Sequence, residues 1–137
     1  MKPRFSTGMA VICIGLLAGS SSQAQSWQLL TQSIALKSGE SVEVADIYWV
    51  MNCRSQLTSP PEVTVLDGPP GVIATITEAM VVPRFQQCSK PVKGGKLKLI
   101  AGKIEDESRS EMTIRIRYKT KDGVRDQSKT FIVALFP

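Results

Sequence analysis

Residues 112–119 read Met-Thr-Ile-Arg-Ile-Arg-Tyr-Lys and alternate strictly between apolar and polar side chains. Successive side chains of a β-strand point to opposite faces, so this pattern predicts a strand with one face in a core and the other in water. The predicted inward face consists of Met112, Ile114, Ile116 and Tyr118. The predicted outward face consists of Thr113, Arg115, Arg117 and Lys119.

The rest of the chain is divided into short strand-like segments by glycine, proline and other turn residues. Asp122-Gly123 is a strong hairpin signal, and it leads to an apolar final strand over residues 128–136. Further strands are predicted at residues 33–37, 41–44, 47–53, 62–66, 72–77 and 96–100, and turns at 37–40, 67–71 and 93–96. No long amphipathic helix interrupts this series. The pattern therefore predicts an all-β fold, a small antiparallel β-sandwich.

The strand–Asp-Gly–strand tail with its apolar C-terminus is similar in general pattern to the last hairpin of bacterial immunoglobulin-like domains. The similarity covers only about 30 residues and implies an immunoglobulin-like sandwich. One feature departs from antibody-type domains, in which the tryptophan lies between the two cysteines. Here Trp49 precedes both Cys53 and Cys88.

Cys53 and Cys88 are predicted to form a disulfide. The third cysteine, Cys13, lies in an N-terminal apolar run, and the spacing of the other two is unlike the Cys-x-x-Cys of oxidoreductases. On the predicted strand 47–53, Trp49 and Cys53 share one face. Trp49 is then either a platform for a ligand or a core residue packed near the disulfide, and the pattern favours the core.

The N-terminus has the three parts of a secretory signal. Lys2 and Arg4 provide positive charge, residues 9–18 form an apolar run too short to span a bilayer, and small residues at Ser22 and Ala24 suit cleavage after Ala24. The sequence thus predicts a signal peptide at 1–24 and one domain at 25–137, periplasmic or secreted. An uncleaved N-terminal anchor is the alternative. No other apolar run has membrane-spanning length.

The composition argues against an enzyme. The chain has no histidine, so the commonest general base and metal ligand is missing. No cofactor is predicted. Glu105, Asp106, Glu107 and Glu111 lack the spacing of a calcium loop and are flanked by basic residues, so a solvated charged loop is expected and no metal site.

Charge points to a partner other than nucleic acid. The net charge of +5 includes two basic residues of the leader, and no aromatic residues are interleaved with the basic ones. If strand 96–100 pairs with strand 112–119, one basic face would contain Lys96, Lys98, Arg115, Arg117 and Lys119. Such a face suits an anionic envelope component such as lipopolysaccharide, an acidic polymer or an acidic protein surface, or else it only keeps the sheet soluble.

Two loops are the other candidate contact surfaces. One contains Asp67, Pro69 and Pro70, and the other contains Arg84 close to Cys88. The resulting hypothesis is an exported, non-catalytic binding or structural module that contacts an unknown envelope protein or anionic component. The alternative is an inhibitor or accessory factor of an exported enzyme, because a disulfide-tethered Pro83-Arg84 loop resembles a substrate of trypsin-like proteases. The stiff 67–71 segment is also explained as a simple strand connector.

Overall fold

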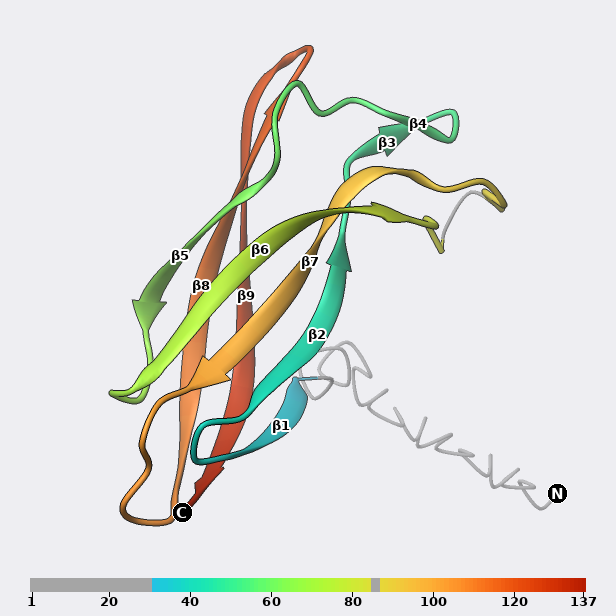
Figure 1. Ribbon diagram of the computed structural model, residues 1–137. Coiled ribbons are helices and arrows are strands. Elements are labelled where there is room, and N and C mark those ends of the chain that lie inside the picture. Colours follow the sequence, from blue (N-terminus) through green and yellow to red (C-terminus); the bar gives the residue numbers. More distant parts are fainter. Residues whose placement is uncertain (1–30, 85–86) are drawn as a thin grey trace, which may run out of the picture.

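The computed structural model describes residues 31–84 and 87–137, and their regular structure is entirely β-strand. The predicted signal peptide, residues 1–24, lies outside the described residues. The strands are β1 (Gln32–Lys37), β2 (Ser41–Ile47), β3 (Val50–Met51), β4 (Arg54–Ser55), β5 (Glu62–Asp67), β6 (Val72–Val81), β7 (Val92–Ala101), β8 (Ser108–Thr120) and β9 (Gly123–Phe136) (Figure 1). The predicted all-β class is confirmed.

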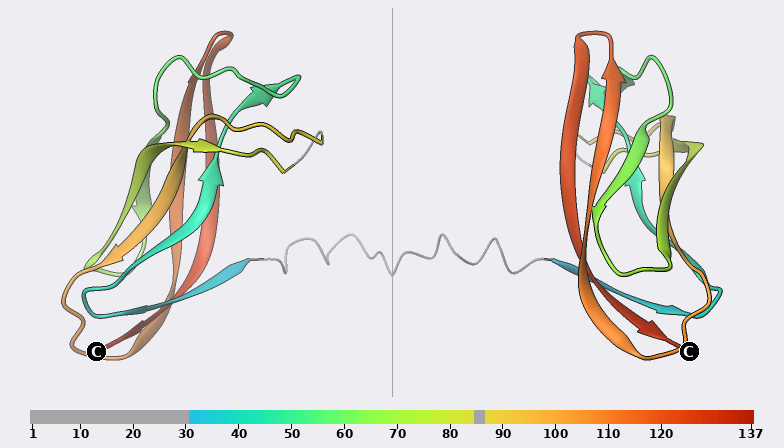
Figure 2. Two further views of the ribbon diagram at one scale, coloured as in Figure 1. Left: turned by 45° about the vertical axis from the view of Figure 1, so that its right-hand side comes forward. Right: turned by 90° about the vertical axis from the view of Figure 1, so that its left-hand side faces the viewer.

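The longer strands form two sheets that lie as separate layers (Figure 2). One sheet has the order β1-β9-β8-β5 and the other has the order β2-β7-β6, while β3 and β4 form a small hairpin. Neighbouring strands are antiparallel, except that β1 runs parallel to β9. Along the chain, β2 lies in the second sheet, β5 in the first and β6 again in the second, so the chain passes repeatedly between the two layers.

The core lies between the two sheets and follows the alternation of the strands. Met112, Ile114, Ile116 and Tyr118 of β8 are buried, as predicted, and the residues between them are partly or fully exposed. From the opposite sheet, Leu97 and Leu99 of β7 enter the same hydrophobic cluster. In β9 the alternation is confined to its second half, where Phe131, Val133 and Leu135 are buried.

The prediction of one strand over residues 47–53 is wrong. β2 ends at Ile47, and the chain then forms the β3–β4 hairpin, whose two turn residues are Asn52 and Cys53. Both have positive φ, 51° and 59°, which is the backbone that a two-residue type I′ hairpin requires. Asparagine tolerates this conformation well, but an alternating apolar pattern does not reveal it. Cys53 therefore lies at a hairpin tip.

The predicted turn at residues 93–96 is also wrong, because Gly94 and Gly95 lie inside β7. The glycines are required there for close packing and not for a bend. A Cβ atom on Gly94 would overlap the carbonyl oxygen of Ile47 and would lie 2.8 Å from Cγ2 of Val81. A Cβ atom on Gly95 would lie 2.5 Å from Cγ2 of Ile76.

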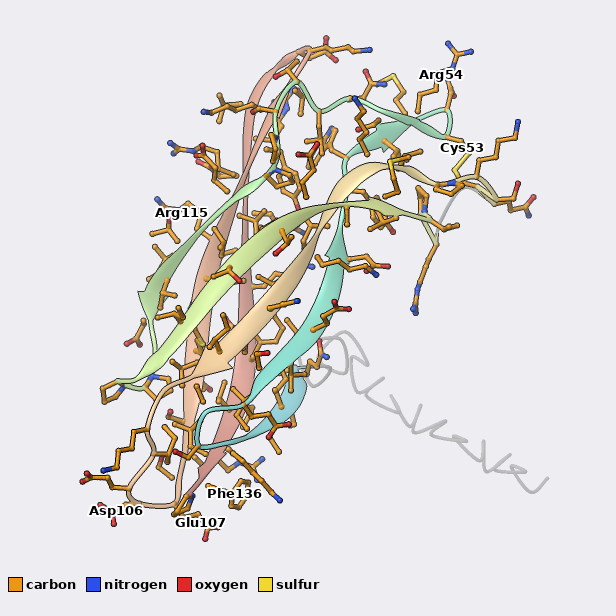
Figure 3. All side chains as sticks on the ribbon, viewed as in Figure 1. Cys53, Arg54, Asp106, Glu107, Arg115 and Phe136 are labelled. Carbon is orange, nitrogen blue, oxygen red and sulfur yellow. A yellow bond between two sulfur atoms is a disulfide. The ribbon has the colours of Figure 1, made fainter. Side chains whose placement is uncertain are left out.

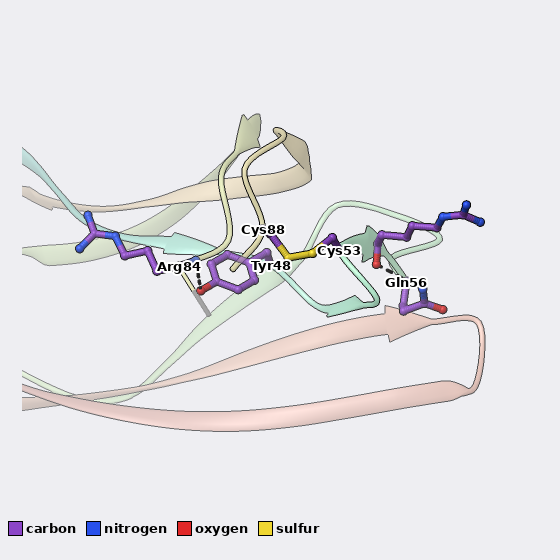
Figure 4. Close-up of a disulfide and its surroundings, with 6 residues drawn as sticks. Tyr48, Cys53, Gln56, Arg84 and Cys88 are labelled. Carbon is purple, nitrogen blue, oxygen red and sulfur yellow. Dashed lines mark hydrogen bonds between the residues drawn. A yellow bond between two sulfur atoms is a disulfide. The ribbon is translucent and has the colours of Figure 1, made fainter. Parts of the chain in front are cut away.

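The predicted disulfide between Cys53 and Cys88 is confirmed. It joins the tip of the β3–β4 hairpin to the connection between β6 and β7 (Figure 4). Two hydrogen bonds join the same parts of the chain: the Arg84 backbone N–H donates to the Tyr48 hydroxyl at 3.2 Å, and Ser55 Oγ donates to the Lys93 carbonyl at 2.9 Å. These links fix one end of the molecule.

Replacing Gly94 with alanine should destabilise the fold by about 2 kcal/mol, because the added methyl group overpacks the contact between β2, β6 and β7. Gly102→Ala is the matched control, since its Cβ would meet nothing nearer than 3.4 Å. Urea unfolding of both variants measures the difference. Equal midpoints would show that β7 does not pack this closely.

Replacing both Cys53 and Cys88 with alanine should lower the free energy of unfolding by about 2–4 kcal/mol, because the bond closes a long loop in the unfolded chain. Urea unfolding of the double variant, compared with the oxidised native protein, gives the value. Alkylation of free thiols on the native protein is the companion measurement. A native protein with two reactive thiols would contradict the pairing.

Candidate binding groove

Among the residues that the structure describes, the first half of β9 has an open edge. β1 pairs only with residues Phe131–Phe136 of β9, although β9 begins at Gly123. Within the described parts of the chain, no strand pairs with β9 between Gly123 and Thr130 on the side away from β8. The backbone N–H and C=O groups of such an edge are available to another extended chain.

Two adjoining cavities lie beside this edge, and together we call them the side groove. The first, of about 380 Å³, is lined by Asp46, Tyr48, Trp49, Val50, Tyr118, Gln127 and Lys129. The second, of about 530 Å³, is lined by Gln32, Glu43, Val44, Ala45, Asp46, Tyr48, Arg84 and Lys96. They share Asp46 and Tyr48. The side groove thus extends from the inward face of β9 along the outer edge of β2.

An aromatic pair forms the apolar wall of the side groove. The ring centroids of Trp49 and Tyr118 are 5.1 Å apart, with the planes tilted by 50°. Trp49 is half-buried against the hydrophobic cluster and also lines the cavity, so it has the core role that the sequence favoured and retains an accessible ring. Tyr118 is buried, and its hydroxyl donates to Oε1 of Gln127 at 2.8 Å. Burial raises the pKa of Tyr118 to about 12.

The two lysines of the side groove differ in their ion pairing. Nζ of Lys96 lies 2.7 Å from Oδ1 of Asp46, and this hydrogen bond raises the pKa of Lys96. Lys129 is half-buried, and burial lowers its pKa. In the described residues no ion pair holds Lys129.

The predicted basic face is not a single patch. Strand β7 does not pair with β8, so Lys96 and Lys98 lie in one sheet while Arg115, Arg117 and Lys119 lie in the other. Most of these cations also have acidic neighbours on adjacent strands. The ion pairs are Lys96–Asp46 at 2.7 Å, Lys98–Glu43 at 4.0 Å, Arg117–Asp126 at 3.0 Å and Lys119–Glu62 at 3.3 Å.

The two predicted contact loops lie at different places. Arg84 is exposed and lines the side groove together with Lys96. Pro69 and Pro70 instead line a separate cavity of about 420 Å³ with residues of the 103–106 loop. Asp67 ends β5 beside them. Figure 3 shows Asp106 and Glu107 at the end of the molecule opposite Cys53.

The acidic residues 105–107 and Glu111 are exposed. Among the described residues, no three histidine, cysteine or acidic side chains are grouped so that they could hold a metal ion. The part of the chain that the structure describes also contains no helix with the length and apolar character needed to cross a membrane.

Several residues of the side groove were not predicted, namely Asp46, Tyr48, Gln127 and Lys129. One signal for Lys129 is present in the sequence, because it lies two residues before the inward-facing Phe131 and therefore on the inward face of the same strand. A lysine at an inward position is unusual and marks a place where the core opens. Asp46 and Tyr48 line the groove because β2 ends between them, at Ile47. The sequence instead predicted a longer strand over residues 47–53.

The chain matches no protein-family model, no curated protein sequence and no solved structure. The groove must therefore be interpreted from its own geometry.

The phenol of Tyr118 should titrate at about pH 12, because burial disfavours the phenolate. The chain has two tyrosines, so a Tyr48→Phe variant isolates this titration in the ultraviolet absorbance of phenolate. The folded pKa is raised, so the stabilisation is complete below the unfolded value of 10.0 and is lost as the pH rises toward about 12. A folded Tyr48→Phe variant that titrates at its unfolded pKa would contradict the burial of Tyr118.

Proposed function

We propose that the protein is an exported, non-catalytic binding domain with an immunoglobulin-like sandwich fold. Its ligand is an extended segment of another protein of the cell envelope, and that segment occupies the side groove. The observation that carries the proposal is the open half of β9 beside the cavity walled by Trp49 and Tyr118.

The strand order supports the immunoglobulin-like assignment. Such domains place their second, fifth and fourth strands in one sheet and their third, sixth and seventh in the other. The order β2-β7-β6 corresponds to the first set, and β5-β8-β9 corresponds to the second, if the β3–β4 hairpin is treated as an insertion. The strand β1 then corresponds to the first strand of the domain, but it pairs with β9 instead of joining the sheet of β2 as in constant-type domains.

Export is supported by two independent features. The N-terminal sequence has the form of a signal peptide, and the mature chain contains the Cys53–Cys88 disulfide. Disulfides persist in oxidising compartments such as the periplasm or the extracellular space. The partner is therefore sought among envelope proteins.

Binding by strand addition suits the geometry of the side groove. An extended peptide can pair with a free sheet edge through its backbone, while alternate side chains enter pockets. The uncovered edge of β9 supplies the backbone groups, and the adjoining aromatic wall supplies a surface for an apolar side chain. Aromatic residues at the centre of a contact commonly contribute most of its affinity.

A non-catalytic role agrees with the chemistry of the lining residues. The chain contains no histidine, and the carboxylate of Asp46 is engaged by Lys96. The hydroxyl of Tyr118 is already bonded to Gln127, and its raised pKa keeps it protonated at neutral pH. These groups are arranged to hold a shape and to offer hydrogen bonds.

The proposal is tested by selecting peptides from a fragment library of the host's envelope proteins and mapping where they bind. Amide hydrogen exchange should slow at alternate residues within 124–130 when a selected peptide is added, because the N–H groups that point away from β8 gain partners. The exposed edge of β6 is the internal control and should be unchanged. Protection that appears only at β6, or the absence of any binding fragment, would refute the proposal.

A substitution gives the companion test. Trp49→Leu should weaken binding of the selected peptide by about tenfold, since it removes an aromatic wall of the side groove. Met51→Ala is the control, because Met51 is 54% exposed on the neighbouring hairpin and does not line the groove. Fluorescence polarisation of labelled peptide measures both affinities.

A further inference from the structure

Lys129 is the lysine of the side groove that has no ion-pair partner among the described residues. It lies on the inward face of β9, in line with the buried residues Phe131, Val133 and Leu135, and its neighbour across the ladder is the buried Ile114. Burial removes part of the hydration of the ammonium, and this cost is recovered when a carboxylate binds it. Lys96 shows the paired case in the same groove, since it is held by Asp46.

In the described residues, no carboxylate side chain lies within ion-pair distance of Lys129. The residues outside the described ranges contain no acid, because the first acidic residue of the sequence is Glu40 and residues 85 and 86 are phenylalanine and glutamine. Another molecule can therefore supply the carboxylate that Lys129 lacks.

The surroundings of Lys129 suit such a group. Gln127 lies two residues away on the same face, and its Oε1 is occupied by the Tyr118 hydroxyl, so its amide N–H groups remain as donors. The wall beside them is the aromatic pair of Trp49 and Tyr118. The competing carboxylate in the cavity, Asp46, is bound to Lys96 at 2.7 Å.

Resting on the proposed function, we infer that the side groove recognises an aspartate or glutamate side chain of the extended partner segment. The carboxylate binds the ammonium of Lys129, and an apolar residue next to the acid packs against Trp49 and Tyr118. The lowered pKa of Lys129, caused by burial, is consistent with an ammonium that lacks its counter-ion and should rise when the carboxylate is bound.

The test uses pairs of acetylated and amidated peptides, derived from a fragment that binds, in which one residue is either glutamate or glutamine. The native protein should prefer the glutamate peptide by about tenfold, the effect expected for a hydrogen bond between charged groups. Blocking both peptide termini ensures that the carboxylate comes from the side chain. The other source of a carboxylate is the C-terminus of the partner, and a peptide with glutamine and a free C-terminus tests it. A preference for this peptide over the blocked glutamate peptide would overturn the inference.

Lys129→Gln should abolish this preference while the glutamine peptide still binds with its original affinity. Lys119→Gln is the matched control, because Lys119 lies on the outer face of β8 beside Glu62, does not line the side groove and should leave the preference intact. A preference for glutamate that persists in Lys129→Gln would overturn the inference. Equal binding of both peptides to the native protein would also overturn it while leaving the proposed function in place.

Two other outcomes concern the occupant. If no peptide binds, the proposed function fails together with this inference. If the native protein forms a Lys129-dependent dimer in sedimentation without any peptide, the carboxylate comes from a second copy of the chain, and the inferred partner is wrong. Circular dichroism of Lys129→Gln and Lys119→Gln verifies that each variant is folded before binding is compared.

Discussion

The difference in length between β9 and the strand that covers it is the constraint on which this structure depends. β9 has 14 residues and is paired with β8 from Gly123 to Leu135, but β1 has only 6 residues and reaches only the second half of β9. The second half is therefore a central strand with an apolar inward face. The first half lies at an edge, where polar residues such as Gln127 and Lys129 replace the core.

The composition of this edge suits its exposure. An exposed strand edge invites uncontrolled pairing, and charged side chains reduce that risk. Within the described residues, the part of β9 that β1 does not cover carries Arg125, Asp126 and Lys129. We propose that the same charges also select the partner, since only a segment with complementary groups recovers the hydration that Lys129 loses.

The predictions succeeded where local pattern determines structure. The alternation of residues 112–119 correctly identified the buried side chains of β8, and Cys53 and Cys88 proved to be paired. The predictions failed at Asn52-Cys53, because a two-residue turn there interrupts a segment whose hydrophobic pattern shows no break. They failed again at Gly94-Gly95, because a glycine pair is the same in sequence whether it permits a bend or a close approach of neighbouring strands.

The sequence by itself determined most of the strands, the faces that they bury and the residues that form the disulfide, because these depend on the period of the side chains and on the number of cysteines. Only the tertiary structure decided which strands are neighbours. It therefore separated Lys96 and Lys98 from Arg115, left half of β9 uncovered, and brought Trp49 to Tyr118 and Lys129. The physical reason is that the alternation of side chains along a strand shows which way each side chain points, but it carries no information about the neighbouring strand. Which strands become neighbours is set by packing between residues far apart in the chain.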